Sequence, residues 1–409
     1  MQPVRAEPAD VRRGNLALVL RRLREAGPRS RAKLAEETDL TKATVSSLVA
    51  DLLRRGLLAE GTLIQPAAGR PALNYQLGTR VYGIGVEISV DYLSVVVLDL
   101  TGAVRVSRRR ACDVPAATPA QTLDAVASLV RNAAGELTGG WAAGLAVAAP
   151  GHVDELSGRV SYAAALGWHD VPVVAELARR LPELAGRIEL ENDVRFSAIA
   201  EYAMGAAAGT ADLAYLSGET GVGVAVVIEG RLARGAYGYA GEIGHLPLNS
   251  EPVPCPCGRT GCWETLVGLA ALLRYAADPG DPVHDHGVDV EVRLAELARR
   301  ADAGDRRTRD ALHRVARGLG LGASVLLNLV NPGVLVLGGY FAVLGEHLLA
   351  EVREEIAARV IAPDSGGCRV ELSRLTLTAA ALGGAYTSLE RVFADPTVVP
   401  PTPVPTAAC

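Results

Sequence analysis

The sequence predicts an α/β protein that consists of a small helical head and a larger body with two similar α/β lobes. Three observations support this fold class. The chain has 409 residues, which is too long for one ordinary hydrophobic core. Apolar residues recur at helical spacing between residues 11 and 56. From Val81 onward the pattern changes to short apolar strands, and a similar group of strands returns later in the chain.

The pattern divides the chain into four segments. We expect a flexible N-terminus at 1–10, the head at 11–78, the body at 79–393 and a disordered tail at 394–409, which is rich in Pro, Thr and Val. Within the body, lobe one is expected at about 79–195 with a C-terminal helix at 376–393, and lobe two at about 196–375. The N-terminus lacks the apolar stretch of a secretory signal, and no apolar run is long enough to span a bilayer. We therefore expect a cytoplasmic protein without membrane contact.

The head is expected to form three helices and a hairpin. The first helix carries apolar residues at helical spacing and ends at Gly27-Pro28. Ser30 is a suitable cap for a short second helix. Asp39 stands in the turn before a third helix that opens at Thr41, and Asp tolerates the left-handed backbone of such turns better than most residues do. After Gly56, two short apolar runs form a hairpin.

The third helix and the hairpin predict a winged helix-turn-helix. A buried stripe on this helix consists of Val45, Leu48, Val49, Leu52 and Leu53. The opposite stripe consists of Lys42, Ala43, Thr44, Ser46 and Ser47, which are small or polar and able to lie against base edges and phosphates. The hairpin tip, Ala67 to Pro71, resembles a wing with Arg70 positioned for a minor groove. The candidate DNA contacts are therefore Lys42, Thr44, Ser46, Ser47 and Arg70.

The charge distribution agrees with a head that meets a polyanion. Residues 1–80 contain 14 Lys and Arg against 8 Asp and Glu, a net charge of +6, whereas residues 81–409 contain 27 against 38, a net charge of −11. Double-stranded DNA is the expected partner of the basic head. A small helical module for protein interaction is the alternative interpretation, because three short helices alone are a common pattern.

The body begins with a strand meander and repeats it. The first meander is expected at 81–86, 93–100 and 104–110, followed by a buried strand at 145–149. The second is expected at 213–216, 223–228 and 231–234, followed by a strand at 333–337 that ends at paired glycines. Two lobes built on the same plan predict a duplicated α/β domain with a cleft between the lobes.

A cysteine cluster in the second lobe predicts a metal site. Cys255, Cys257 and Cys262 stand close together among small turn residues, and His245 precedes them by ten residues. Three thiolates and one imidazole fit a tetrahedral zinc site. Four protein ligands leave no position for a catalytic water, so we expect the Zn2+ to be structural. The alternative is three ordinary thiols in a loop.

At these residues the sequence resembles the ROK family of bacterial repressors and sugar kinases. The resemblance is carried by the run Gly235-Ala236-Tyr237-Gly238-Tyr239-Ala240-Gly241-Glu242-Ile243-Gly244-His245, by the cysteine cluster and by Trp263-Glu264. Supporting matches are Ala149 to Asp154, Leu166-Gly167-Trp168, Glu191-Asn192-Asp193, Thr220 to Gly223 and Asn331 to Gly339. The resemblance spans roughly residues 11–393. It implies a two-lobed actin-like ATPase (ribonuclease H-like) fold and the winged head of the family's repressors.

The resemblance also implies a set of sugar contacts. These are Asn192, Asp193, Glu242, His245 and Glu264, with Asp193 at the position of the kinase general base. The chemistry is reasonable because carboxylates accept hydroxyl hydrogens and an imidazole can ligate zinc with one nitrogen and meet a hydroxyl with the other. Asn192 could also cap the helix that follows, and Glu264 could simply complement a helix dipole.

Two departures from the family pattern bear on function. Kinases of the family carry an Asp followed by a Gly-Gly-Thr turn that approaches the ATP phosphates, and this chain has Glu87-Ile88-Ser89-Val90-Asp91 there. The lost glycines and the carboxylate of Asp91 predict poor ATP binding. Sugar-binding members usually carry Pro-Asn where this chain has Ala164-Ala165.

We therefore expect a non-enzymatic transcriptional regulator, a repressor of carbohydrate-related genes. It is expected to bind operator DNA and to respond to a sugar or sugar derivative. A homodimer or tetramer would present paired heads to two half-sites. One alternative is an active sugar kinase with an attached DNA-binding head. Another is a ligand-free zinc-dependent regulator that responds to a protein partner. Ala165, which stands where sugar-binding members usually carry Asn, is the reason for this alternative.

Overall fold

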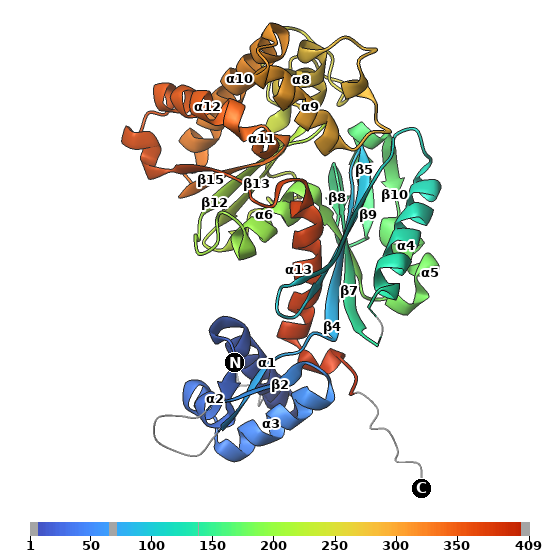
Figure 1. Cartoon of the computed structure of the whole chain (residues 1–409), viewed down its shortest axis with the longest axis vertical. Helices are drawn as coiled ribbons and strands as arrows, with labels where there is room; N and C mark the ends of the chain where they lie inside the picture. Colours follow the sequence, from blue (N-terminus) through green and yellow to red (C-terminus); the bar gives the residue numbers. More distant parts are fainter. Residues whose placement is uncertain (1–6, 65–71, 138, 402–409) are drawn as a thin grey trace.

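The computed structural model describes residues 7–64, 72–137 and 139–401 and confirms an α/β fold with a helical head and a two-lobed body (Figure 1). The head contains α1 (Pro8–Ala26), β1 (Arg29–Ser30), α2 (Arg31–Thr38), α3 (Lys42–Arg54), β2 (Leu58–Ile64) and β3 (Ala72–Leu77). Its three strands form a sheet in the order β1-β3-β2. Helix α1 begins before the expected residue 11, because Pro8 suits the first turn of a helix.

The local signals of the head have the expected geometry. The Ser30 hydroxyl accepts a hydrogen bond from the Lys33 amide and caps α2. Asp39 ends that helix in the left-handed region, with φ 56°. Thr41 caps α3 by accepting a hydrogen bond from the Thr44 amide. The wing tip, including Arg70, lies outside the described residues.

The body contains two lobes, each built around a five-stranded sheet. Lobe one contains β4 (Val81–Ile88), β5 (Tyr92–Asp99), β6 (Val104–Ala111), α4 (Pro119–Gly135), β7 (Trp141–Ala149), β8 (His152–Asp154), β9 (Arg159–Ala163), β10 (Trp168–Val171), α5 (Val173–Arg180) and β11 (Ile188–Asn192). Lobe two contains β12 (Leu213–Gly218), β13 (Val222–Ile228), β14 (Arg231–Leu232), α7 (Glu264–Val267), α8 (Leu269–Ala276), α9 (Val290–Asp302), α10 (Arg306–Val330), β15 (Val334–Gly339), α11 (Tyr340–Val343), α12 (Gly345–Arg359) and β16 (Arg369–Leu372). Helices α6 (Asp193–Met204) and α13 (Ala379–Ala394) pack against each other beside the first sheet.

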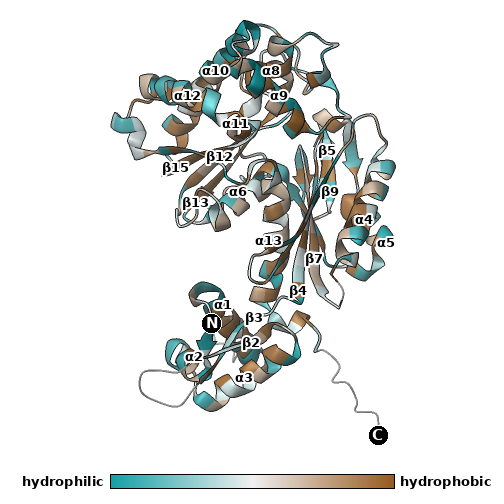
Figure 2. Cartoon of the chain, in the orientation of Figure 1, coloured by the Kyte–Doolittle hydropathy of each residue, from teal (hydrophilic) through white to brown (hydrophobic). Residues whose placement is uncertain are grey.

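The two sheets share one topology, which confirms the duplication. The first has the order β11-β7-β4-β5-β6 and the second the order β16-β15-β12-β13-β14. In each lobe the first three strands along the chain pair as antiparallel neighbours. The next two strands of that sheet, β7 and β11 or β15 and β16, then pair in parallel on the other side of the first strand. Strands β4 and β5 are buried along their whole length, as expected for central strands covered on both faces. Figure 2 shows the corresponding apolar residues along this sheet.

Helix α13 lies directly on the first sheet and against α6. Gly85 makes this close approach possible, because a Cβ atom at that position would stand 1.8 Å from the Ala381 carbonyl oxygen of α13. On the other side, a Cβ atom at Gly383 would stand 1.8 Å from the Phe196 carbonyl oxygen of α6. The helix that carries Asp193 at its first turn is therefore in tight contact with α13.

The head packs against the C-terminal end of α13. The Arg24 side chain forms an ion pair with Glu390, and its guanidinium lies 4.0 Å from the ring centre of Phe393. Only a short turn separates β3 from β4. Head and body therefore share one continuous hydrophobic cluster, which includes Leu16 of the head and Leu389 of α13.

The expected disordered tail from residue 394 is wrong for residues 395–401. Val399 is buried in the cluster between head and α13, and the Arg55 side chain donates hydrogen bonds to the carbonyl oxygens of Thr397 and Val399. Burial of an apolar side chain outweighs the Pro-rich composition in this stretch. Residues 402–409 lie outside the described residues. Among the helices that the structure describes, none has the length and apolar character that a membrane crossing requires.

Candidate functional site

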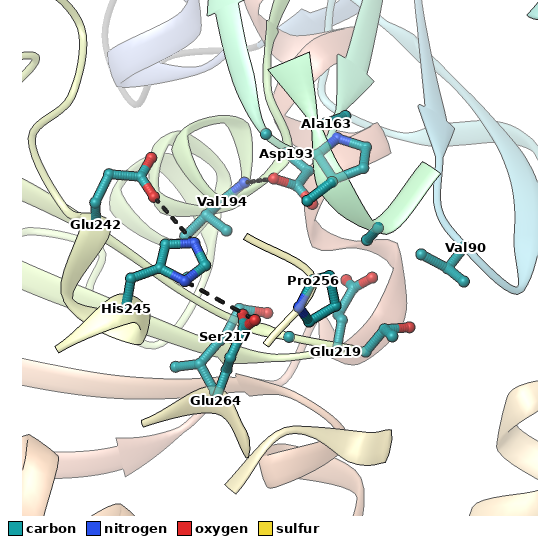
Figure 3. Close-up of a pocket in the computed structure, with 18 of the residues that line it drawn as sticks. Val90, Ala163, Asp193, Val194, Ser217, Glu219, Glu242, His245, Pro256 and Glu264 are labelled. Carbon is teal, nitrogen blue, oxygen red and sulfur yellow. Dashed lines mark hydrogen bonds and ion pairs between the residues drawn. The ribbon is translucent and has the colours of Figure 1, made fainter. Parts of the chain in front are cut away.

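A cavity of about 390 Å³ lies between the two lobes. It is lined by the first turn of α6, the turn after β12 and the segment 238–264 of lobe two. A site of this size between two lobes is typical for a small molecule. The five sugar contacts implied by the resemblance, Asn192, Asp193, Glu242, His245 and Glu264, all line it, and four of them are labelled in Figure 3. We call this region the cavity end of the cleft.

Asn192 and Asp193 stand where β11 ends and α6 begins. The Asn192 side-chain oxygen accepts hydrogen bonds from the amides of Val194 and Arg195, and its amide donates to the Gly151 carbonyl oxygen. Asn192 is therefore a helix cap, as the sequence allowed. One oxygen of Asp193 accepts from the Val194 amide at 2.8 Å, which leaves the other oxygen of the carboxylate available to the cavity.

Asp193 and Glu219 line the cavity, and the buried carboxyl group of Glu87 lies close enough to feel their charges. Burial raises the pKa of Asp193 to about 6, and the charge of Glu242 acts in the same direction. Burial, followed by the charge of Asp193, raises the pKa of Glu219 to about 8. Glu87 is 1% exposed, and its pKa is also raised, first by burial and then by Glu219 and Asp193. Crowding of like charges away from water has this effect because the charged forms are disfavoured.

His245 faces the cavity and the cysteines at the same time. It ends a short 3-10 helix, Glu242–His245, and its Nδ1 atom lies 3.7 Å from the Cys255 Sγ atom. Its Nε2 atom lies 3.8 Å from a carboxylate oxygen of Glu242. One imidazole nitrogen therefore faces the thiols, and the other faces the side of the cavity that carries Glu242. Figure 3 shows His245 between Glu242 and Glu264.

The donor atoms of His245, Cys255, Cys257 and Cys262 lie within 4.8 Å of one another. The Sγ atoms of Cys257 and Cys262 are 3.7 Å apart. Two ligands at the ~2.3 Å zinc–sulfur distance in a tetrahedron are separated by about 3.8 Å, so this spacing suits a tetrahedral ion. The residues therefore fit a metal such as zinc.

Glu264 lies between this cluster and the cavity. Its Oε1 atom lies 2.8 Å from the Cys255 Sγ atom and 3.8 Å from the His245 Nδ1 atom, and the residue is the first of α7. A carboxylate this close to the cluster can support the ligands as well as meet a bound molecule. Glu264 therefore ties the loop with the three cysteines to the wall of the cavity.

The turn between β4 and β5 is held against lobe two. Asp91 is buried, contacts the Nδ1 atom of His286 and forms an ion pair at 2.7 Å with Arg293 of α9, which is also buried. On the neighbouring strand, Arg109 forms ion pairs with Asp289 and Glu291 of the same segment. We call these contacts the closed end of the cleft. The charge of Asp91 is thus met by Arg293, a partner that the sequence analysis did not identify.

Four of the predicted DNA-contacting residues, Lys42, Thr44, Ser46 and Ser47, belong to α3. Lys42 and Ser47 are exposed, whereas Thr44 and Ser46 are half-buried. The opposite stripe is buried as expected, with Leu53 half-buried at its end. Arg12 of α1 donates a hydrogen bond to the Ser47 hydroxyl and forms an ion pair with Asp51. Helix α1 therefore helps to hold α3 in position.

Several residues of the cleft were missed by the sequence analysis. Glu219 could have been noticed as a carboxylate between a buried strand and the glycine turn Thr220 to Gly223. Arg293 and His286 gave no signal, because an arginine on an amphipathic helix and a histidine in a loop are common surface features. Their role depends on contacts with Asp91, which is 202 and 195 residues away in the chain.

Comparisons with known proteins agree with this architecture. Residues 83–391 match the family model described as the ROK family. A xylose repressor of Caldicellulosiruptor bescii is 28% identical over 380 residues, which cover 90% of this chain and 94% of the repressor. The solved structure of a ROK family transcriptional regulator, a homolog of the E. coli Mlc protein, aligns with a TM-score of 0.72 and 22% identity over 94% of this chain and 97% of that one. A ROK family glucokinase from Streptomyces griseus, in complex with glucose and AMPPNP, aligns with a TM-score of 0.66 and 26% identity over 76% of this chain and 99% of the kinase.

Proposed function

The chain belongs to the ROK family, and from this we propose that it is a transcriptional repressor of sugar-related genes, which binds a double-stranded DNA operator with its head and a sugar or sugar derivative with its body. The observation that carries the proposal is the extent of the match. Relatives named xylose repressors align with at least 90% of the chain, so their match extends into the head. The glucokinase structure covers a smaller share.

The head supports DNA binding through α3 and the wing. Lys42 and Ser47 are exposed on α3, and Thr44 and Ser46 of the same helix are half-buried. These side chains would lie in a major groove, with Arg70 of the wing in the adjacent minor groove. A homodimer or tetramer would place two heads on two half-sites.

Salt-dependent binding tests the DNA contacts. An operator is first selected from a random DNA pool with the purified protein, and affinity is then measured by gel shift at several salt concentrations. Lys42→Ala and Arg70→Ala should weaken binding and reduce the salt slope by about one each if they contact phosphates. Arg306→Ala, an exposed arginine of lobe two, is the matched control and should change neither quantity. Unaltered affinity in both head variants would mean that another face binds DNA.

The cavity end supports sugar sensing. Asp193 belongs to α6, whereas Glu242, His245 and Glu264 belong to lobe two, so a ligand that contacts both sets favours the closed cleft. A structural zinc ion on His245, Cys255, Cys257 and Cys262 would hold the second set in place, with four protein ligands and no catalytic water.

The contact between α6 and α13 offers a route from the cavity to the head. Helix α6 carries Asp193, α13 packs tightly on α6, and Arg24 of the head pairs with Glu390 of α13. A ligand that shifts α6 would therefore move the surface on which the head rests. In a dimer this movement would change the distance between the two heads.

Fluorescence anisotropy with labelled operator tests the coupling. Thermal melting against xylose, glucose, N-acetylglucosamine and their phosphates first identifies a ligand, because a compound that binds only the native state raises its stability. That ligand should change operator affinity by a typical coupling of about 1–3 kcal/mol. Asp193→Ala and Glu264→Ala should bind the operator normally and lose the response, with zinc content measured in parallel. An equal response in both variants would place the sensing site elsewhere.

A sugar kinase is the second candidate, and the position of Asp193 favours it. A carboxylate with a pKa of about 6 in a cavity suits a general base, and Thr220 to Gly223 line the same cavity. Against it, Glu87 to Asp91 form no glycine turn for phosphates, and Asp91 is engaged with Arg293. ADP release with ATP, magnesium and the same sugars tests this candidate. Turnover on the order of 1 s⁻¹ or faster would establish an enzyme.

A further inference from the structure

One end of the first sheet carries a group of arginines beside the head. Strands β4, β7 and β11 are parallel neighbours, so their first residues lie at the same end of this sheet. Arg80 precedes β4, Arg187 precedes β11, and Arg391 lies in the last turn of α13. We call these three residues the arginine patch. In Figure 1 the lower ends of β4 and β7, where these strands begin, point toward the head.

The members of the patch are close to one another. The Arg80 guanidinium donates a hydrogen bond to the Gly139 carbonyl oxygen at 2.9 Å, and the Arg80 carbonyl oxygen accepts one from the Trp141 amide. The guanidinium carbon of Arg187 lies 4.8 Å from the ring centre of Trp141. Burial, followed by the charge of Arg391, lowers the pKa of Arg187, because two cations stand near each other.

The patch holds these cations without a close anion. Among the described residues, its guanidinium groups donate only to backbone carbonyl oxygens, and none forms an ion pair with a carboxylate. Glu183 and Glu189 act on the patch from further away. Residues 81–409 carry a net charge of −11, so carboxylates are plentiful elsewhere on the body. Because like charges repel, an anion that contacts several of these arginines would be favoured.

The patch adjoins the C-terminal end of α3. A Cβ atom at Gly56, two residues after this helix, would stand 3.8 Å from the Cβ atom of Arg80. The stretch from Ser47 to Gly56 is about 13 Å long at the rise of an α-helix. The major groove of DNA is about 12 Å wide. With Ser47 in this groove, the phosphates that border the groove lie beside the end of α3 that Arg80 adjoins.

We propose that the arginine patch is a second DNA-binding surface, which contacts backbone phosphates beside the base pairs read by α3 and the wing. A guanidinium presents parallel N–H donors to phosphate oxygens and is only weakly hydrated. Contacts of this kind fix the orientation of a protein on the duplex without reading its sequence. The body would then bind the operator directly, in addition to carrying the head. This inference rests on the proposed DNA-binding function.

The salt dependence of operator binding tests the patch in the full-length protein. The duplex carries the selected operator with about one helical turn, ~10 base pairs, added at each end. Arg80→Gln/Arg391→Gln should reduce the slope of log affinity against log salt by about two for each bound protomer. Raising the salt from 50 to 200 mM should then cost this variant about tenfold less affinity than the wild type, for each protomer. Arg187 is left in place because it packs on Trp141.

Two further variants separate a phosphate contact from a structural role. Arg80→Lys/Arg391→Lys keeps both positive charges and should keep most of the slope. Arg299→Gln/Arg306→Gln removes two exposed arginines of lobe two and should leave the slope unchanged. Thermal melting of each variant shows whether its fold is intact.

Ethylation interference locates the phosphates involved. The wild type should require a set of phosphates that Arg80→Gln/Arg391→Gln no longer requires, while the remaining pattern stays the same. An unchanged slope or an unchanged pattern in this variant would overturn the proposal. Failure of the wild type to bind any DNA would overturn the proposed function itself.

Discussion

The two ends of the cleft join the same two lobes by different means. At the closed end, Asp91 and Arg109 of lobe one reach α9 and the loop before it through buried or half-buried ion pairs. At the cavity end, Asp193 and Glu242 stand across an open space, and burial together with the charge of Glu242 raises the pKa of Asp193. The closed end is therefore held by charged contacts with α9 and the loop before it. At the cavity end the lobes also meet, because Arg234 pairs with Glu191 and Glu155 and Arg195 donates to the Gly238 carbonyl oxygen, and a bound molecule would add contacts across the open space.

The cluster of His245, Cys255, Cys257 and Cys262 provides the largest test of the cavity end. Cys257→Ser should lose the metal and lower the free energy of unfolding by several kcal/mol, because structural zinc contributes about 10–16 kcal/mol of apparent binding free energy. Elemental analysis and thermal melting measure both effects, and protein purified without added metal should contain about one zinc per chain. Cys368→Ser, a cysteine near β16, is the control and should retain the metal. A metal-free variant with unchanged stability would show that the cluster does not stabilise the fold through a bound metal.

The ion pair at the closed end is the next test. Arg293→Met leaves the buried carboxylate of Asp91 without its closest arginine and should cost about 3–5 kcal/mol of unfolding free energy. Urea unfolding measures this cost. Arg306→Met removes an exposed arginine of α10 and should change stability by no more than about 0.5 kcal/mol. Equal stability of the two variants would mean that the closed end does not hold the lobes together.

The pH dependence of stability gives the smallest effect. The pKa of Glu219 is raised to about 8, so the native chain binds more protons than the unfolded chain between the usual glutamate pKa and pH 8. Stability should therefore fall as the pH rises through this window and stay level above it. Glu219→Gln should reduce the fall and raise the melting temperature at pH 9 relative to the wild type. Thermal melting at pH 5 and pH 9 tests this, with the exposed Glu346→Gln as control. A wild-type melting temperature that rises over this range would contradict the assignment.

The sequence predicted local features better than distant contacts. Ser30, Asp39 and Thr41 form caps and turns whose partners are a few residues away, so their geometry followed from residue type. The repeated meander predicted the duplicated sheets because the three strands of each meander pair with their neighbours in the chain. At the cavity, the glycine-rich run before His245 marked the right segment.

The closed end and the ordered tail depend on contacts between distant parts of the chain. Asp91 was expected near phosphate oxygens, and nothing in its neighbourhood pointed to Arg293. The stretch from Asp395 to Val399 has the composition of a disordered tail, and its order depends on carbonyl groups that accept hydrogen bonds from Arg55. Backbone contacts of this kind leave no pattern of residue types to detect.

The packing of the C-terminal segment against the head sets a limit on engineered sensors. A hybrid regulator that combines this body with the head of another protein would normally be cut in the short turn between β3 and β4. Val399 is 1% exposed and belongs to the cluster that also contains Leu16, and Arg55 of the native head binds the same segment. A foreign head would meet a surface shaped for another partner. Residues 395–401 would therefore have to be exchanged together with the head, as one unit made of two pieces of chain.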